Sequence, residues 1–107
     1  MKGGMMYSKG DIVVINFPFS DLIHAKKRPM LVLAEKGEDV IGCAITSNPL
    51  SEGIPIEYNQ GSLPFKSKIK HWQIHTFLSS LIARKIAKIS QETHKKVLNN
   101  IQKLFQP

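Results

Sequence analysis

Apolar residues in the first half of the chain fall in short, nearly continuous runs, which predict strands rather than helices. Residues 11–17 (DIVVINF) are rich in β-branched side chains and end at Pro18. Residues 28–34 and 40–46 have the same character, and the turn-forming stretch EKGED separates them. Runs without a clean polar alternation are typical of strands that are covered on both faces. We therefore expect a compact barrel or tightly coiled sheet, with a loop over residues 18–27.

The second half of the chain is more mixed. Residues 54–58, which contain Pro55, predict a short edge strand, and residues 59–62 (NQGS) predict a turn. Residues 67–76 have strand character with mixed polarity. Residues 78–89 fit either a helical turn that leads into a strand or a single helix.

The end of the chain has a helical pattern. Ser90 is a suitable N-cap, and Glu92 is favourable in a first helical turn. The apolar residues that then recur on one helical face are Val97, Leu98, Ile101, Leu104 and Phe105. We expect this helix to close over the core. Five or six short strands with one C-terminal helix indicate a mainly β fold, a small SH3-like barrel.

Length and composition agree with one domain over residues 1–107. The longest apolar run, residues 12–15, is far too short to cross a bilayer. The first residues lack the apolar core of a secretory signal, so we expect a cytoplasmic protein. The lone Cys43 excludes an internal disulfide and a cysteine-based metal cluster, and its apolar neighbours indicate a small core residue.

Positive charge is concentrated in the second half of the chain. The formal net charge is +7, and residues 54–107 hold nine Lys or Arg against two Asp or Glu, whereas residues 1–53 hold six of each. This asymmetry favours a polyanionic partner such as nucleic acid. The competing interpretation is that the lysines only keep a small domain soluble.

The stretch KKRPMLVLA places three cations directly before an apolar strand. Pro29 keeps Arg28 extended at the mouth of that strand, where a guanidinium presents donors that suit phosphate oxygens. Lys26 and Lys27, on the expected loop, would steer a polyanion toward it. Charged loops are common, so a simple ion pair is the alternative. Its candidate carboxylates are Asp21, Glu35 and Glu38.

A second polar cluster follows the third expected strand. Thr46, Ser47 and Asn48 can hydrogen-bond a phosphate or a base edge, although such residues more often cap a turn. The short loop between the second and third strands makes them antiparallel. This pairing brings Arg28 close to Thr46 and Ser47 on one rim of the barrel.

A third stretch, KSKIKHWQIHT, covers residues 66–76. Its alternating lysines, Lys66, Lys68 and Lys70, would share one face of a strand next to Trp72, which is typical of a track for single-stranded nucleic acid. The alternatives are that the tryptophan is a core residue and that His71 and His75 are ordinary surface residues. No metal site is expected, because the histidines lack ligand spacing and a nearby carboxylate pair.

The segments GDIVVINFPFSD, KKRPMLVLA and VIGCAITSN resemble the MazF/PemK family of toxin endoribonucleases, as does the later segment HWQIHTFLSSLIARKIAKIS. The resemblance implies an SH3-like barrel, a homodimer, and sequence-selective cleavage of single-stranded RNA without a metal or cofactor. The implied product is a 2′,3′-cyclic phosphate, formed by attack of the RNA 2′-hydroxyl. It also implies a cognate acidic antitoxin that occupies the RNA groove, with DNA bound only indirectly through the antitoxin complex.

The family roles transfer to particular positions of this sequence. Arg28 matches the catalytic arginine, Thr46 the catalytic threonine, and Ser47 a neighbour that binds the scissile phosphate. Gln73 and Thr76 match polar residues of the late segment. The further candidates for RNA binding are Lys26, Lys27, Asn48, Lys66, Lys68 and Lys70.

The proton-transfer partners differ from those of the family. This chain has Ile23 and Trp72 where some members carry acidic residues, and His75 where some carry an arginine. Because imidazole titrates near neutral pH, the candidates for the general base are His24, His71 and His75.

Two other functions compete with RNA cleavage. One is a protein-binding poison of the same barrel family, a gyrase inhibitor of the CcdB type, which would act through its C-terminal helix. The other is a catalytically weak RNA-binding module.

Overall fold

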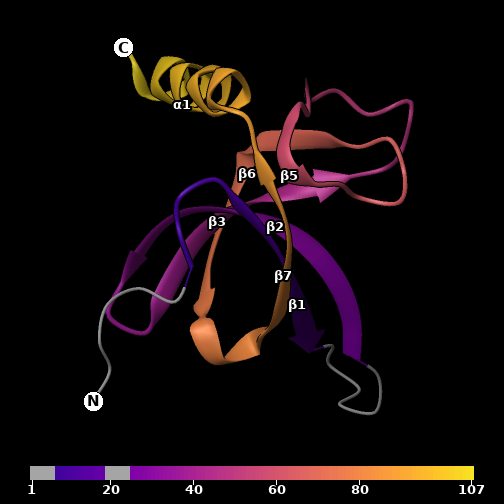
Figure 1. The fold of residues 1–107 in the computed structure, drawn as a ribbon. Coiled ribbons are helices and arrows are strands. Elements are labelled where there is room, and N and C mark those ends of the chain that lie inside the picture. Colours follow the sequence, from indigo (N-terminus) through magenta and orange to yellow (C-terminus); the bar gives the residue numbers. More distant parts are fainter. Residues whose placement is uncertain (1–6, 19–24) are drawn as a thin grey trace.

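The computed structural model of this chain describes residues 7–18 and 25–107 and contains seven strands, all paired antiparallel, and one α-helix (Figure 1). The elements are β1 (Asp11–Pro18), β2 (Ala25–Lys36), β3 (Asp39–Thr46), β4 (Ile54–Pro55), β5 (Tyr58–Gly61), β6 (Lys68–Leu78), a 3-10 turn (Ser79–Leu81), β7 (Ile82–Ile89) and α1 (Gln91–Phe105).

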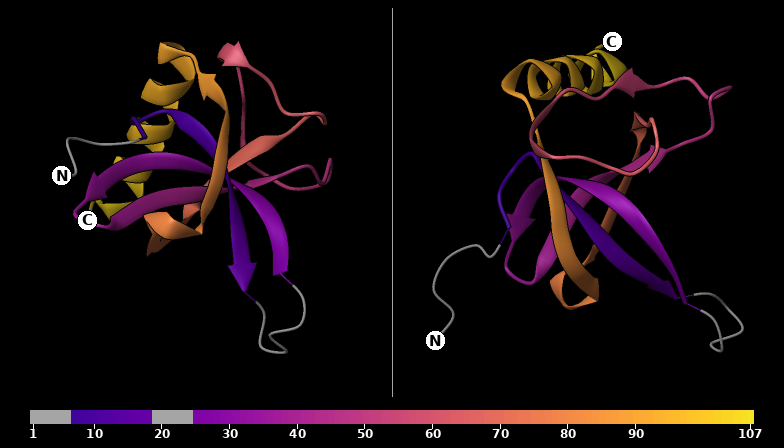
Figure 2. Two further views of the ribbon diagram at one scale, coloured as in Figure 1. Left: turned by 60° about the horizontal axis from the view of Figure 1, so that its bottom comes forward. Right: turned by 45° about the vertical axis from the view of Figure 1, so that its right-hand side comes forward.

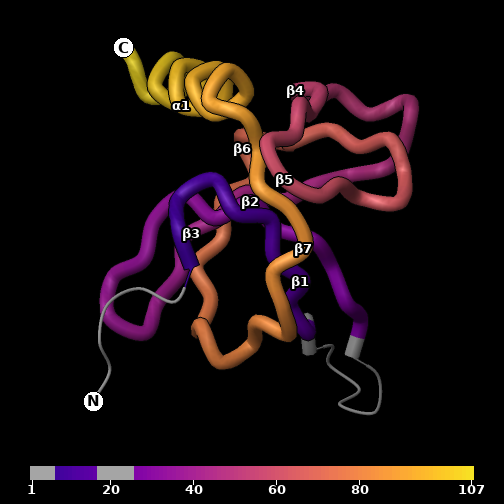
Figure 3. Tube along the Cα trace, in the orientation of Figure 1, coloured from indigo at the N-terminus to yellow at the C-terminus, as the bar shows by residue number. Residues whose placement is uncertain are grey.

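The strands form one strongly coiled sheet in the order β4-β6-β3-β2-β1-β7-β5. Its two edge strands, β4 and β5, are separated along the chain by only Ile56 and Glu57. Two residues span little distance, so the two edges of the sheet must curl toward each other (Figure 3). The result is a half-barrel with a C-terminal helix, which confirms the expected mainly β, barrel-like fold class.

Apolar side chains are buried on both faces of this sheet. Along β1, Ile12 packs into one cluster with Leu31, Cys43 and Val97. The next residue, Val13, packs into a second cluster, whose other buried members are Ile15, Met30, Val32 and Val40. Neighbouring residues of a strand point to opposite faces, so unbroken apolar runs produce two cores. The predicted coverage on both faces is confirmed.

The start of β2 differs from the expectation. The predicted loop over residues 18–27 is wrong at its end, because Lys26 and Lys27 lie within β2, opposite Phe17 and Asn16 of β1. Pairing with β1 extends the strand beyond what its charged sequence indicates by itself. Pro29 is therefore inside β2, at a point where pairing with β3 has not yet begun; the β3 ladder starts at Met30. A proline at that position removes no bond from the ladder with β3.

The structure also shows the conformation of two segments in the second half of the chain. The turn predicted at residues 59–62 is wrong for most of its length, because β5 runs to Gly61 and pairs with β7. Residues 78–89 adopt the first of the two expected alternatives, a single 3-10 turn that leads into β7.

The helix α1 begins as predicted. The Ser90 hydroxyl caps it by accepting a hydrogen bond from the Thr93 N–H at 3.1 Å. Thr93 and Val97 are buried and Ile101 packs against the core, but the last apolar residues of the helix are exposed. The helix runs outward from the end of β7 to the C-terminus, so only its first turns cover the sheet (Figures 1 and 2). The expected closure over the core is therefore correct only for this first part.

In the residues that the structure describes, no helix combines the length and the apolar character needed to cross a membrane.

Candidate functional site

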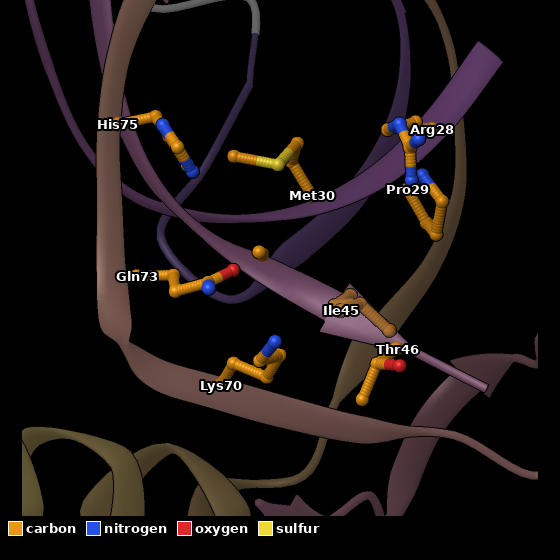
Figure 4. Close-up of a pocket in the computed structure, with 9 residues that line it drawn as sticks. Arg28, Pro29, Met30, Ile45, Thr46, Lys70, Gln73 and His75 are labelled. Atoms are coloured by element: carbon orange, nitrogen blue, oxygen red, sulfur yellow. The ribbon is translucent and has the colours of Figure 1, made fainter. Parts of the chain in front are cut away.

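A cavity of about 250 Å³ lies where β2, β3 and β6 meet (Figure 4). We call it the first cavity. The described residues that line it are Arg28, Pro29, Met30, Ala44, Ile45, Thr46, Lys70, Gln73 and His75. The side chains of Lys70, Gln73 and His75 extend from β6 toward the middle of the cavity (Figure 4). Two cationic groups, an imidazole, an amide and a hydroxyl thus surround one small space.

Strand register explains why Arg28 and Thr46 reach the same space. Met30 of β2 lies opposite Ala44 of β3, which in turn lies opposite Lys70 of β6. Residues directly opposite each other share a face of the sheet, and so do residues two positions apart on one strand. Arg28 precedes Met30 by two positions and Thr46 follows Ala44 by two. Both therefore lie on the same face of the sheet as Met30, Ala44 and Lys70.

An irregularity in β6 brings further polar residues to the cavity. Cys43 lies opposite Ile74, but the next residue of β3, Ala44, lies opposite Lys70. Three extra residues of β6 therefore bulge out between these two pairs. A bulge redirects side chains relative to a regular strand. Gln73 comes from this bulge, Lys70 directly precedes it, and His75 lies two positions after Gln73.

His71 also lies in the bulge, but it is not among the residues that line the first cavity. Its Nδ1 is buried and has no hydrogen-bond partner among the described residues, and its ring stands edge-on to Trp72 at 5.2 Å between centroids. The thiol of Cys43 donates a weak hydrogen bond to the His71 carbonyl at 3.8 Å. Burial raises the pKa of the Cys43 thiol to about 12, so it stays protonated as a core residue and is not a nucleophile.

A larger cavity of about 710 Å³ adjoins the first one, with which it shares lining residues at the start of β2 and the end of β3. We call it the second cavity. A row of opposite residues, Pro29 of β2, Val14 of β1 and Arg84 of β7, lies along its wall. The other described residues that line it are Lys26, Lys27, Arg28, Ile45, Thr46, Ser47, Asn48, Leu63, Pro64, Phe65, Ser67 and Ile86. Arg28 and Thr46 therefore line both cavities.

The segment after β3 is held by side-chain hydrogen bonds. The Thr46 Oγ1 accepts from the Asn48 N–H at 3.1 Å, and the Asn48 Oδ1 accepts from the Leu50 N–H at 2.9 Å. These are the turn-capping roles that the sequence left open beside phosphate binding. The Thr46 hydroxyl still has its own proton to donate.

Of the three alternating lysines, Lys68 and Lys70 share one face of β6, opposite Thr46 and Ala44, whereas Lys66 lies outside the strand. Lys66 precedes β6 and lines a third, smaller cavity. Lys68 donates to the backbone carbonyl of Ser51 at 2.8 Å and of Pro49 at 3.4 Å, which fixes it to the loop after β3. Lys70 alone lines the first cavity, with its Nζ 5.7 Å from the Trp72 ring centroid. The predicted shared face therefore holds for Lys68 and Lys70 and fails for Lys66, which precedes the strand.

Electrostatic surroundings at the rim are positive. Neither lining set includes a carboxylate. Within residues 7–18 and 25–107 Arg28 makes no salt bridge, and Glu35 instead accepts a hydrogen bond from the Tyr7 N–H at 3.1 Å. Of the expected residues, Ile23 and His24 lie outside the described residues, as does Asp21. The described residues contain no group of three or more His, Cys, Asp or Glu that could hold a metal ion.

Sequence reasoning missed two residues of the second cavity, Phe65 and Arg84. Phe65 is 72% exposed on the loop between β5 and β6, and Arg84 is exposed on β7. Neither has a local motif. Only the pairing of β7 with β1 brings Arg84 into line with Pro29, which is 55 positions earlier in the chain.

Residues 8–105 match the family described as the PemK-like, MazF-like toxin of type II toxin-antitoxin systems. The chain belongs to this family. The resemblance seen in the sequence is thereby confirmed. No curated protein matched the sequence directly.

Solved structures of MazF proteins share the fold. MazF in a MazE-MazF structure from Deinococcus radiodurans superposes with a TM-score of 0.76 at 15% identity, covering 94% of this chain and 96% of that one. The Mycobacterium tuberculosis toxin MazF-mt6 has a TM-score of 0.70 at 19% identity, with 89% and 95% covered. An endoribonuclease in complex with its cognate antitoxin, from Mycobacterial species, has a TM-score of 0.65 at 12% identity, with 92% and 97% covered.

Proposed function

We propose that this toxin-family chain is an endoribonuclease that cleaves single-stranded RNA in the cytoplasm, with the scissile phosphate held between Arg28 and Thr46. The observation that carries the proposal is their shared position: both residues line both cavities. A phosphate at that point would have RNA on either side. The guanidinium would bind the two non-bridging oxygens as a fork, and the Thr46 hydroxyl would donate to one of them.

The proposed reaction is an internal transesterification. The ribose 2′-oxygen forms a bond to phosphorus, the bond from phosphorus to the 5′-oxygen breaks, and a 2′,3′-cyclic phosphate remains. One proton leaves the 2′-hydroxyl and one is taken up by the 5′-oxygen, so no water is consumed. The nucleophile belongs to the substrate, so the proposal needs no metal or cofactor. Charge develops on the phosphorane oxygens, where fixed donors stabilise it.

Arg28 is assigned to this electrostatic stabilisation, since a guanidinium is not deprotonated in proteins and cannot act as a base. His75 is assigned as the general base. It lines the first cavity together with Arg28 and Thr46, whereas His71 does not. Lys70 and Gln73 extend into the same space and would bind the ribose or a neighbouring phosphate. Lys26, Lys27, Ser47 and Asn48 would bind RNA that continues into the second cavity.

An antitoxin is the first partner that we propose for this chain. The related structures of MazE-MazF and of an endoribonuclease with its cognate antitoxin support an acidic antitoxin that binds this chain, whose formal net charge is +7. DNA would be bound only through that complex.

A homodimer is proposed as well, with Trp72 and Ile74 of β6, 39% and 36% exposed, as its apolar contacts. Light scattering of the wild type and of Ile74→Lys tests the dimer.

Cleavage itself is tested with purified protein and a long RNA in the presence of EDTA. The proposal expects discrete cuts that end in 2′,3′-cyclic phosphates. It also expects no cut in a copy of the same sequence that carries a 2′-deoxy residue at the cleaved position, because the nucleophile is then missing. Cleavage of that deoxy copy, or cleavage that stops when EDTA is added, would contradict it.

One observation favours a second candidate, a protein-binding poison of the gyrase-inhibitor type. Leu104 and Phe105, at the end of α1, are 49% and 75% exposed and could contact a protein target. In that case Leu104→Ser with Phe105→Ser would abolish toxicity in growing cells, and Arg28→Ala would not. RNA cleavage requires the opposite pattern. RNA binding without turnover would instead identify the catalytically weak module.

A further inference from the structure

The second cavity contains more than the proposed cleavage reaction uses. Its volume, about 710 Å³, lies in the range of sites that hold a small organic ligand. It begins at Arg28 and Thr46 and extends under the loop between β5 and β6, over Val14 and Ile86. An RNA strand that continues from the scissile phosphate in this direction would enter the second cavity directly.

Cations line two sides of this cavity. Lys26, Lys27 and Arg28 lie on β2, and Arg84 lies on β7 across the β1 residue Val14. No carboxylate is among the described residues that line it, so nothing in this set neutralises the charge. Strands β2 and β7 flank β1 on either side. Two separated cationic positions of this kind suit a ligand with negative charges at two points.

An aromatic side chain, Phe65, lines the same cavity. Phe65 is 72% exposed, yet its loop is fixed. The Ser67 hydroxyl donates to the Phe65 carbonyl at 2.8 Å, and the Leu63 N–H donates to the Tyr58 hydroxyl at 3.2 Å. Pro64 restricts the backbone directly before the ring. A ring that is exposed but held by its backbone is suited to stacking on a flat ligand.

We propose that the second cavity is a nucleotide subsite, in which the base next to the scissile phosphate stacks on Phe65 and the following phosphate binds Arg84. Single-stranded RNA is the ligand that combines repeating negative charges with flat, unpaired bases. Ser47 and Asn48, which also line this cavity, would hydrogen-bond the edge of the stacked base. The subsite would therefore set which nucleotide is accepted beside the cut. This inference rests on the proposed function for the position of the scissile phosphate.

The experiment measures how much each base of the RNA contributes to kcat/KM when the Phe65 ring is present and when it is absent. A short RNA that contains a mapped cleavage site is made with an abasic residue at each position in turn, and kcat/KM is compared for the wild type and Phe65→Ala. For the wild type, one position adjacent to the cut should show a loss of about 5- to 100-fold. In Phe65→Ala this abasic penalty should disappear, and in Phe65→Tyr it should remain. Leu50→Ala, which removes a 91% exposed side chain outside all three cavities, should keep it.

A binding measurement covers Arg84 and does not depend on cleavage. The affinity for fluorescent 2′-O-methyl oligo(A) and oligo(U) is measured over a series of salt concentrations. Arg84→Gln should weaken binding of both and reduce the slope of log K against log salt by about 0.7, the value for one phosphate contact on a single strand. The matched control Lys95→Gln removes one charge from the outer face of α1 and should leave the slope unchanged, because Lys95 lies outside the three cavities.

The outcomes separate this inference from the proposed function. If the wild type cleaves RNA and every abasic penalty persists in Phe65→Ala, the subsite is wrong and the cleavage proposal stands. If no RNA is cut but the oligonucleotides bind and depend on Phe65 and Arg84, the subsite stands without the reaction. Binding of poly-glutamate that depends on Phe65, with RNA binding that does not, would assign the cavity to an acidic peptide and overturn the inference.

Discussion

Arg28 and Thr46 are the polar residues that the two cavities have in common. Arg28 comes from β2 and Thr46 from the end of β3, and the antiparallel register that pairs Met30 with Ala44 brings them together. A ligand that fills both cavities would contact both side chains. We therefore expect a strand-cleaving enzyme to hold the bond that it breaks at this position.

His75 should be the imidazole that matters for the reaction. We expect His75→Gln to lower kcat by about 10²- to 10⁴-fold, the usual contribution of a general base. The measurement is the single-turnover cleavage rate of the variant beside that of the wild type.

His71→Gln is the comparison for that variant. His71 does not line the first cavity, so its substitution should change the cleavage rate little at a temperature where circular dichroism shows the protein folded. A large loss in His71→Gln with an unchanged rate in His75→Gln would reverse the assignment.

Asp11 should be important for stability and not for cleavage. It is buried, its Oδ1 lies 3.3 Å from the Nζ atoms of both Lys85 and Lys88, and its Oδ2 accepts from the Ser8 N–H at 2.8 Å. Asp11→Ala removes this charge-assisted hydrogen bond and both ion pairs, so we expect the free energy of unfolding to fall by about 1–3 kcal/mol. Both lysines are partly exposed, so water screens the two ion pairs and they contribute only a small part of this loss of stability.

Urea denaturation measures this change, with Asp39→Ala as the control because Asp39 is exposed on β3. A loss in Asp11→Ala no larger than that in the control would show that the buried carboxylate does not stabilise the junction of β1 and β7.

His94 should make stability depend on pH. Burial, and then the positive charges of Lys88 and Lys9, lower the pKa of His94 below its ordinary value of 6.5. Below pH 6.5 the unfolded chain binds a proton that the folded chain does not, so folding becomes less favourable. This contribution is fully present above pH 6.5 and is lost as the pH falls toward the lowered pKa of the folded state.

The test is the free energy of unfolding of the wild type and of His94→Gln, measured by urea denaturation from about pH 8 to about pH 5. The wild type should lose more stability than the variant over the acidic part of this range. Equal slopes would mean that His94 titrates alike in the folded and unfolded chains.

The sequence predicted those elements whose signals are local. The β-branched run of β1 and the Ser90 cap of α1 are recognised from neighbouring residues, and both lie where they were expected. The start of β2 could not be predicted, because Lys26 and Lys27 are ordered by pairing with β1 and not by their own propensity. A strand that forms only through pairing with a neighbour cannot be recognised from its own amino-acid sequence.

The same distinction applies to the site. The antiparallel pairing of two neighbouring strands was enough to place Arg28 near Thr46. Arg84 could not be found, since it reaches the second cavity only through the register of β7 on β1. The three-residue bulge in β6 was also invisible, and it decides that Gln73 lines the first cavity while His71 does not.

The most direct test of the central claim is the cleavage rate of Arg28→Ala on a mapped RNA site, measured beside Arg28→Lys and the wild type. Arg28 is exposed and outside both core clusters, so the fold should survive the substitution. We expect Arg28→Ala to lose at least about 10²-fold in kcat, as when one fixed donor is removed from a developing negative charge. Arg28→Lys should recover only part of this loss, because an ammonium cannot bind two phosphate oxygens as a fork. A folded Arg28→Ala protein that cleaves RNA at the wild-type rate would contradict the account.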